Sequence, residues 1–221
     1  GQFDIIPTFL VFLAFTTLAY DKKRWQWSAL LLGFGIGVKT FPLILIPAFL
    51  AEFSSKKRML GFLSIVLAPV LFSSLLAVEA SPIEVFQNVF GYRGMVGGSW
   101  GFSGLFWVMG RFFEYVVKIP MGQHAMDVAW NLYNSFGVYL IFVFIGISYL
   151  TLFKRMSLLE RIVYTYLGFY VFSNAVSNQY FVWILPFLFF SKFRFVSGFH
   201  FWSIIIMGVY IPAVSEGAFH L

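Results

Sequence analysis

Long apolar runs alternate along this chain with short basic clusters. An apolar run over residues 4–20 ends at the cluster 22–24, KKR, and two shorter runs, 25–38 and 41–51, end at a second cluster, 56–58. Because lysine and arginine accumulate in short cytoplasmic loops of membrane proteins, both clusters are expected on the cytoplasmic side. The chain must then enter and leave the membrane between them. This pattern predicts a hairpin of two short legs with Lys39 at its tip.

The rest of the chain continues the alternation. Residues 59–78, with a kink at Pro69, 130–153 and 195–213 are each expected to cross the membrane, and a second pair of short legs, ending near 172 and 192, should meet at an outer turn over 173–181. A Gly-rich outer loop is expected over 79–104, an amphipathic helix on the outer interface over 105–118, and a further outer loop over 119–127. Arg161 is assigned to a short cytoplasmic turn.

Composition supports this interpretation. The chain is 60% hydrophobic and 11% charged, with a mean hydropathy of +0.85. These values predict an all-α polytopic transmembrane helical bundle, with residues 1–221 as a single transmembrane domain. Most basic residues fall in the expected cytoplasmic segments, so the net charge of +6 indicates topology and leaves no surface for nucleic acid. The first span begins almost at Gly1 without a methionine, and we expect the chain to be the C-terminal part of a longer protein.

Lys39 is the first candidate for a binding site. A charged side chain within the bilayer costs about 3 kcal/mol or more, and such groups usually line a cavity and serve a function. Pro42 and the alternating Gly33, Gly35 and Gly37 indicate a broken, closely packed tip. We interpret Lys39 as a ligand for an anion such as a lipid phosphate. The alternative is that its side chain extends to the outer interface without a function.

The Gly-rich loop supplies a second set of candidates. Tyr92, Arg93 and Trp100 lie among six glycines between residues 91 and 104. An arginine can bind phosphate oxygens while aromatic rings hold a sugar or a lipid headgroup. The alternative is an interfacial belt of aromatic side chains.

Other polar residues are expected on the same outer face. Asp4 either caps its helix or belongs to the site. His124 and Asp127 alone are too few for a metal site, so none is predicted. A transporter would place polar groups at the bilayer midplane in repeated halves, and the sequence shows no such repeat. The remaining outer candidates are Gln2, Glu84, Asn178, Gln179 and Tyr180.

Four stretches carry a resemblance to a known family: the opening GQFD, GFGIGVKTFP, YRGMVGGSWGFSG, and SNQYFVW followed by Pro186. They resemble the GT-C glycosyltransferases, in particular the mannosyltransferase-like branch. The resemblance implies a multi-pass enzyme that transfers a mannose-like hexose from a polyprenyl-phosphate donor to a glycan or glycolipid acceptor at the extracytoplasmic or lumenal face. It further implies that Lys39 and Arg93 meet the donor phosphate, and that Gln2, Asn178, Gln179 and Tyr180 line the sugar and acceptor cavity.

The catalytic base is the point of departure from that family. Such enzymes usually carry the catalytic carboxylate on the first outer loop, ahead of the Gly-Gln helix, and this chain starts after it. Asp4 and Glu84 are the carboxylates that remain, and a divalent cation is left open. A transporter of lipid-linked intermediates, a non-catalytic membrane subunit and a purely structural bundle remain as alternatives.

Overall fold

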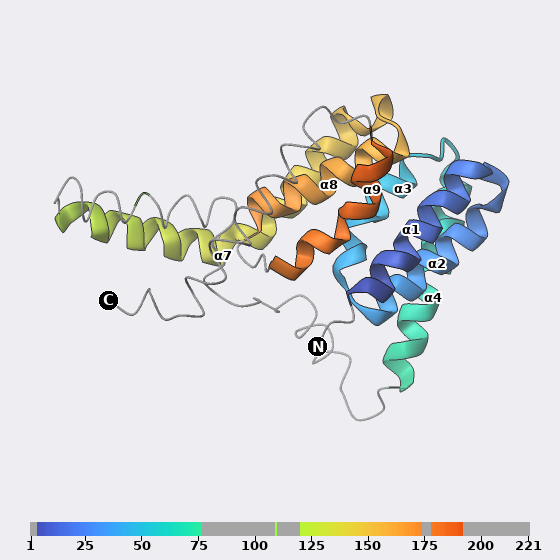
Figure 1. Cartoon of the computed structure of the whole chain (residues 1–221), viewed down its shortest axis with the longest axis horizontal. Coiled ribbons are helices and arrows are strands. Elements are labelled where there is room, and N and C mark those ends of the chain that lie inside the picture. Colours follow the sequence, from blue (N-terminus) through green and yellow to red (C-terminus); the bar gives the residue numbers. More distant parts are fainter. Residues whose placement is uncertain (1–3, 77–108, 110–119, 174–177, 192–221) are drawn as a thin grey trace.

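The computed structural model describes residues 4–76, 109, 120–173 and 178–191, and within these ranges it is all-helical with no strand. This confirms the all-α prediction for the described part of the chain. Figure 1 shows the arrangement of the main helices. In chain order the elements are α1 (Ile5–Tyr20), η1 (Lys22–Arg24), α2 (Trp25–Val38), η2 (Phe41–Leu45), α3 (Ile46–Leu50), α4 (Lys56–Leu76), α7 (Pro120–Thr151), η4 (Phe153–Arg155), α8 (Leu158–Phe172), η5 (Asn178–Trp183) and α9 (Leu185–Phe190).

Helices α1 and α2 are antiparallel and lie side by side (Figure 1), and α2 is also the outgoing leg of the first hairpin, which turns at Lys39. Asp21 closes the turn between them, because its carboxylate accepts a hydrogen bond of 2.9 Å from the backbone N–H of Lys23. Between the helices, the buried Ser28 hydroxyl donates to the Ala14 carbonyl at 2.8 Å. A small side chain on each helix thus lets the backbones approach closely, as is common where helices pack in membranes.

The chain breaks at Lys39, as the sequence predicts. Helix α2 ends at Val38, Lys39 adopts an extended conformation, and η2 and α3 carry the chain back. The returning leg ends near Glu52, whose carboxylate lies 2.8 Å from the ammonium of Lys22, just before α2 begins. The start of the outgoing leg, α2, and the end of the returning leg therefore lie at the same end of the hairpin. Their length is about 21 Å, from 14 residues in α2 at about 1.5 Å each, and Lys39 is the tip.

Close packing at this hairpin depends mainly on Gly33. A Cβ added there would lie 2.5 Å from the Val66 carbonyl oxygen of α4 and 3.1 Å from Pro69 Cγ. Gly35 faces α1 at ordinary contact distance, 3.5 Å from the Pro7 carbonyl oxygen, and Gly37 is exposed. The expectation of a closely packed glycine is confirmed at Gly33, which lets α2 lie directly against α4.

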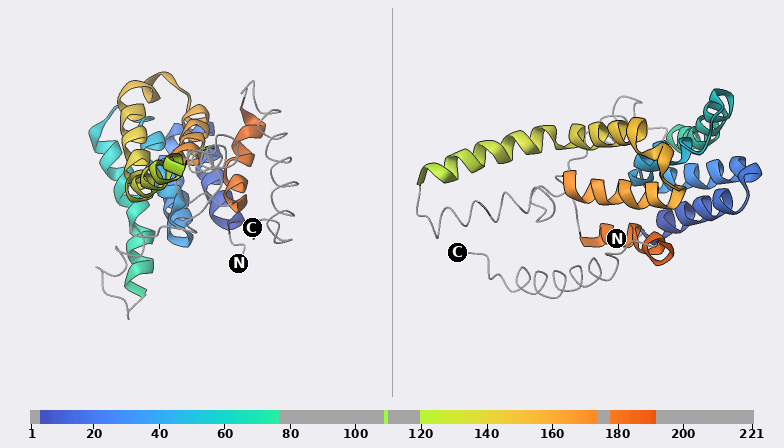
Figure 2. Two further views of the ribbon diagram at one scale, coloured as in Figure 1. Left: turned by 90° about the vertical axis from the view of Figure 1, so that its left-hand side faces the viewer. Right: turned by 90° about the horizontal axis from the view of Figure 1, so that it is seen from above.

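The second hairpin consists of α7 and α8, and it corrects two sequence predictions. Helix α7 starts at Pro120 and includes residues 120–127, which were expected to form a loop. Proline suits the first position of a helix because its fixed φ is helical and its missing N–H needs no partner there. Helix α8 starts at Leu158, after a capping box of Ser157 and Glu160, so Arg161 lies within the helix rather than in a turn. Figure 2 shows the second half of α7 beside α8 and the first half extending away.

No single helix in the described ranges is both long and apolar enough to cross a membrane by itself. The segments 131–137 and 139–151 of α7 meet that requirement together, across a bend of 51°. The Gly-rich loop over 79–104, the amphipathic helix over 105–118 apart from Met109, and the last span over 195–213 lie outside the described residues.

Candidate functional site

The tip of the first hairpin holds an ion pair between Lys39 and Asp4. The Lys39 ammonium donates to Asp4 Oδ1 across 35 positions of sequence. Lys39 directly follows the last residue of α2, and Asp4 directly precedes the first residue of α1. Because α1 and α2 are antiparallel, the end of one helix and the start of the other lie together. The hairpin therefore brings the two charges into contact.

Burial differs sharply between the two partners. The side chain of Asp4 is 6% exposed and that of Lys39 is 37% exposed. Asp4 occupies the N-cap position of α1, but its side chain makes no capping hydrogen bond. Instead, the Asp4 backbone carbonyl accepts from the Thr8 hydroxyl at 2.7 Å. Asp4 is thus at the N-cap position, as one of the two interpretations expected, but its side chain does not cap the helix. The carboxylate pairs with Lys39 instead.

Tyr180 completes the cluster from a third part of the chain. The Lys39 ammonium lies 5.6 Å from the centroid of the Tyr180 ring, within the range of a cation–π interaction. The ring stacks on Trp183 at 4.2 Å, and Trp183 stacks on Phe41 at 3.7 Å with an interplanar angle of 5°. The Tyr170 hydroxyl of α8 donates to the Tyr180 carbonyl at 2.8 Å. The start of η5 is thereby fixed against the hairpin tip.

Three buried polar atoms near this aromatic stack have no hydrogen-bond partner among the described residues: Asp4 Oδ2, the Tyr166 hydroxyl and Trp183 Nε1. Buried polar groups are nearly always paired, so unpaired ones indicate strain, a role in function, or a bound water or ligand. Asp4 Oδ2 is an acceptor, the indole N–H is a donor, and the phenol can be either. A donor, an acceptor and a group that can be either are thus left unpaired by the described residues around the stack.

The cluster combines three chemical capacities. A partly exposed ammonium has further donors for an anion, and a buried carboxylate retains one oxygen for a proton or a hydroxyl group. The neighbouring aromatic rings match the apolar faces of a sugar. No group of three or more histidine, cysteine or acidic residues that could hold a metal ion occurs among residues with a described position.

The structure thus unites three of the predicted site residues: Asp4, Lys39 and Tyr180. Asn178 and Gln179 are the first residues of η5, so their backbone is adjacent to the cluster, while their side chains are not described. The other predicted site residues lie outside the described ranges: Gln2, Glu84, Tyr92, Arg93 and Trp100.

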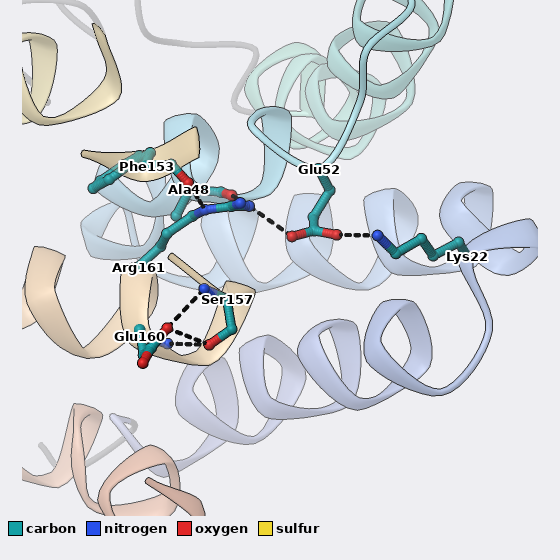
Figure 3. Close-up of polar contacts among 7 residues, drawn as sticks. All are labelled: Lys22, Ala48, Glu52, Phe153, Ser157, Glu160 and Arg161. Carbon is teal, nitrogen blue, oxygen red and sulfur yellow. Dashed lines mark hydrogen bonds and ion pairs between the residues drawn. The ribbon is translucent and has the colours of Figure 1, made fainter. Parts of the chain in front are cut away.

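Sequence reasoning missed a second buried network, shown in Figure 3. One Arg161 terminal nitrogen lies 2.6 Å from Glu52 Oε1 and 3.4 Å from the Ala48 carbonyl oxygen, and Arg161 Nε donates to the Phe153 carbonyl at 2.5 Å. The other Glu52 oxygen pairs with Lys22. The side chain of Arg161 is only 6% exposed. The Ser157–Glu160 capping signature could have predicted that Arg161 lies in the first turn of a helix. It could not have predicted that the Arg161 side chain is buried.

The two clusters lie at opposite ends of the first hairpin. Helix α1 has 16 residues and so is about 24 Å long. Asp4 directly precedes its first residue, and Lys22 lies two positions after its last. The network around Glu52 lies at the end of the hairpin away from Lys39, and its Arg161 side chain is buried. The Asp4–Lys39 pair lies at the tip, and its Lys39 side chain is partly open to solvent.

The sequence model of glycosyltransferase family 87 matches residues 1–173, well over half of the chain. That match includes Asp4, Lys39, Glu52 and Arg161. No curated protein and no solved structure matches the chain. The chain therefore belongs to glycosyltransferase family 87, a family of membrane-associated enzymes that transfer sugars.

Proposed function

We propose that this enzyme transfers a mannose-like hexose from a polyprenyl-phosphate donor to a glycan or glycolipid at the extracytoplasmic or lumenal face. The observation that carries the proposal is the position of Lys39. It is a partly exposed cation at a hairpin tip, beside a buried carboxylate and an aromatic ring. Such a group suits the phosphate of a membrane-bound donor, because a lysine ammonium is a compact positive charge with three donors for phosphate oxygens.

The distribution of basic residues supports the outer face. Residues 22–24 and 56–58 flank the end of the hairpin opposite Lys39. Lys154 and Arg155 belong to η4 (Phe153–Arg155). The Phe153 carbonyl accepts from Arg161 at the Glu52 network, so these two basic residues lie at the same end. If this end faces the cytoplasm, as basic clusters usually do, then Lys39 faces the outer side.

Exposed apolar side chains support a lipid environment. Large hydrophobic side chains are more than half exposed on several helices, and soluble monomers rarely expose such surfaces over a large area. Examples on α1, α4 and α7 are Ile5, Phe9, Leu60, Leu71, Phe72, Phe136, Tyr139, Ile147 and Leu150.

The proposed reaction is a substitution at the anomeric carbon of the donor sugar. The oxygen of an acceptor hydroxyl forms the new bond to that carbon, while the bond from the carbon to the phosphate oxygen breaks. The electron pair leaves with the polyprenyl phosphate, and Lys39, together with Arg93, stabilises the added negative charge. The hydroxyl proton passes to a carboxylate, for which Asp4 and Glu84 are the candidates.

A transfer assay with two donors tests this proposal. The full-length protein is reconstituted into vesicles and given either a radiolabelled polyprenyl-phosphate hexose or the matching nucleotide sugar, together with an acceptor glycolipid. We expect label transfer from the lipid donor alone. Transfer from the nucleotide sugar alone would refute the lipid donor, although the chain would still be a glycosyltransferase.

A further inference from the structure

We propose that Asp4 limits the affinity of the enzyme for its donor by competing with the donor phosphate for Lys39. The Asp4–Lys39 pair is then the donor-free arrangement, and the phosphate takes over part of the ammonium when it binds. This inference rests on the proposed function. In this role Asp4 acts through Lys39 as a positioning and affinity-setting residue.

The geometry makes Lys39 the movable partner. Asp4 is fixed, because it directly precedes α1, its side chain is 6% exposed, and its backbone carbonyl is held by Thr8. Lys39 follows the last residue of α2 in an extended conformation, and its side chain is 37% exposed. A lysine side chain is long and flexible, and its ammonium has three donors. The exposed part of this ammonium can therefore bind an incoming anion while Asp4 stays in place.

The charges then decide the direction of the effect. A phosphate bound to Lys39 places its negative charge beside that of Asp4, and like charges sharing one site disfavour each other. Asp4 Oδ2 has no hydrogen-bond partner in the described part of the chain, so no donor there offsets the repulsion. Removing the charge of Asp4 should therefore strengthen phosphate binding. A purely structural ion pair would give the opposite result, since its loss would loosen the tip.

Tyr180 explains why Lys39 keeps its direction during the exchange. The ammonium lies 5.6 Å from the centroid of this ring, and the ring is held by Trp183 and by the hydrogen bond from Tyr170. The attraction of a cation to an aromatic face involves no net negative charge. It keeps the ammonium at the tip without repelling the phosphate.

The test is a binding titration of the full-length protein in detergent micelles with undecaprenyl phosphate. Asp4→Asn and Asp4→Ser are compared with wild type, and serine is included because it is a favoured N-cap residue that preserves the start of α1. Both variants are expected to bind at least tenfold more tightly. Asp21→Asn is the matched control, because it removes the same charge at the opposite end of α1 and should leave the affinity unchanged.

A double-variant cycle separates the possible outcomes. Lys39→Met should bind more weakly than wild type, and adding Asp4→Asn to it should tighten binding less than Asp4→Asn does alone, because the competition for Lys39 is then absent. Unchanged or weaker binding by folded Asp4→Asn and Asp4→Ser would overturn the inference while leaving the lipid donor intact. If wild type binds no undecaprenyl phosphate, the proposed donor fails and the inference fails with it.

Discussion

The network of Lys22, Glu52 and Arg161 predicts a strict order of stability losses when its members are neutralised one at a time. Glu52→Leu should cost the most, about 3–5 kcal/mol, because it leaves the guanidinium of Arg161 buried without a counter-ion. Arg161→Met should cost less, since Glu52 keeps Lys22 as its partner. Lys22→Met should cost about 0–1 kcal/mol, because the side chain of Lys22 is 72% exposed.

The assay is thermal and denaturant unfolding of the full-length protein in one fixed detergent, followed by tryptophan fluorescence. The double variant Glu52→Leu with Arg161→Met should be more stable than Glu52→Leu alone, because it removes the unpaired buried charge together with its partner. The reasoning is refuted if Lys22→Met destabilises as much as Glu52→Leu, or if Glu52→Leu costs less than about 1 kcal/mol, the value for an exposed pair.

Two further predictions concern packing and helix capping. Gly33→Ala should destabilise the protein by about 1–3 kcal/mol, because its Cβ would lie 2.5 Å from the Val66 carbonyl oxygen; Gly37→Ala, at an exposed position, is the control in the same unfolding assay. Ser157→Ala should cost about 1 kcal/mol by removing the cap of α8. Hydrogen bonds from the Ser157 backbone and side chain lower the pKa of Glu160 in the folded protein. The stabilisation from the ionised Glu160 carboxylate is therefore fully present above the pKa that Glu160 has in the unfolded chain, and it is lost as pH falls through its pKa in the folded protein. The gap in stability between wild type and Ser157→Ala should therefore narrow in acid, and a constant gap would contradict this assignment.

The sequence was sufficient to predict the first hairpin and its tip. The apolar runs and the two basic clusters gave the lengths and directions of α1 and α2, and a lysine followed by Pro42 between two runs marked the break. Asp4 and Lys39 were both expected at the outer end because antiparallel helices place them there. Their direct pairing does not follow from the sequence pattern, which leaves Lys39 as either a phosphate ligand or a side chain that extends to the outer interface.

The Glu52–Arg161 contact could not be predicted from local patterns. The two residues lie 109 positions apart, and their contact depends on how α3 packs against α8. Because Arg161 follows Lys154 and Arg155 within a few residues, local patterns assign it to a cytoplasmic turn. Only the tertiary structure shows that its guanidinium is buried and bonded to the Phe153 and Ala48 carbonyls.

The start of α7 shows a different source of error. Residues 120–127, PMGQHAMD, contain a proline, a glycine and polar side chains, which are typical of a loop. The same proline suits the first position of a helix, and the helix then continues to Thr151. Composition alone could not distinguish these two roles of proline.

The central claim is that Lys39 binds the phosphate of the donor, and the most direct measurement is the transfer rate of the full-length Lys39→Ala variant with a polyprenyl-phosphate hexose. We predict a loss of at least tenfold in transfer, equivalent to about 1.4 kcal/mol of barrier. Arg93→Ala is predicted to give a similar loss. Lys56→Ala, which removes an exposed lysine at the start of α4, should transfer at the wild-type rate. Transfer by folded Lys39→Ala at the wild-type rate would remove Lys39 from the mechanism and contradict the account.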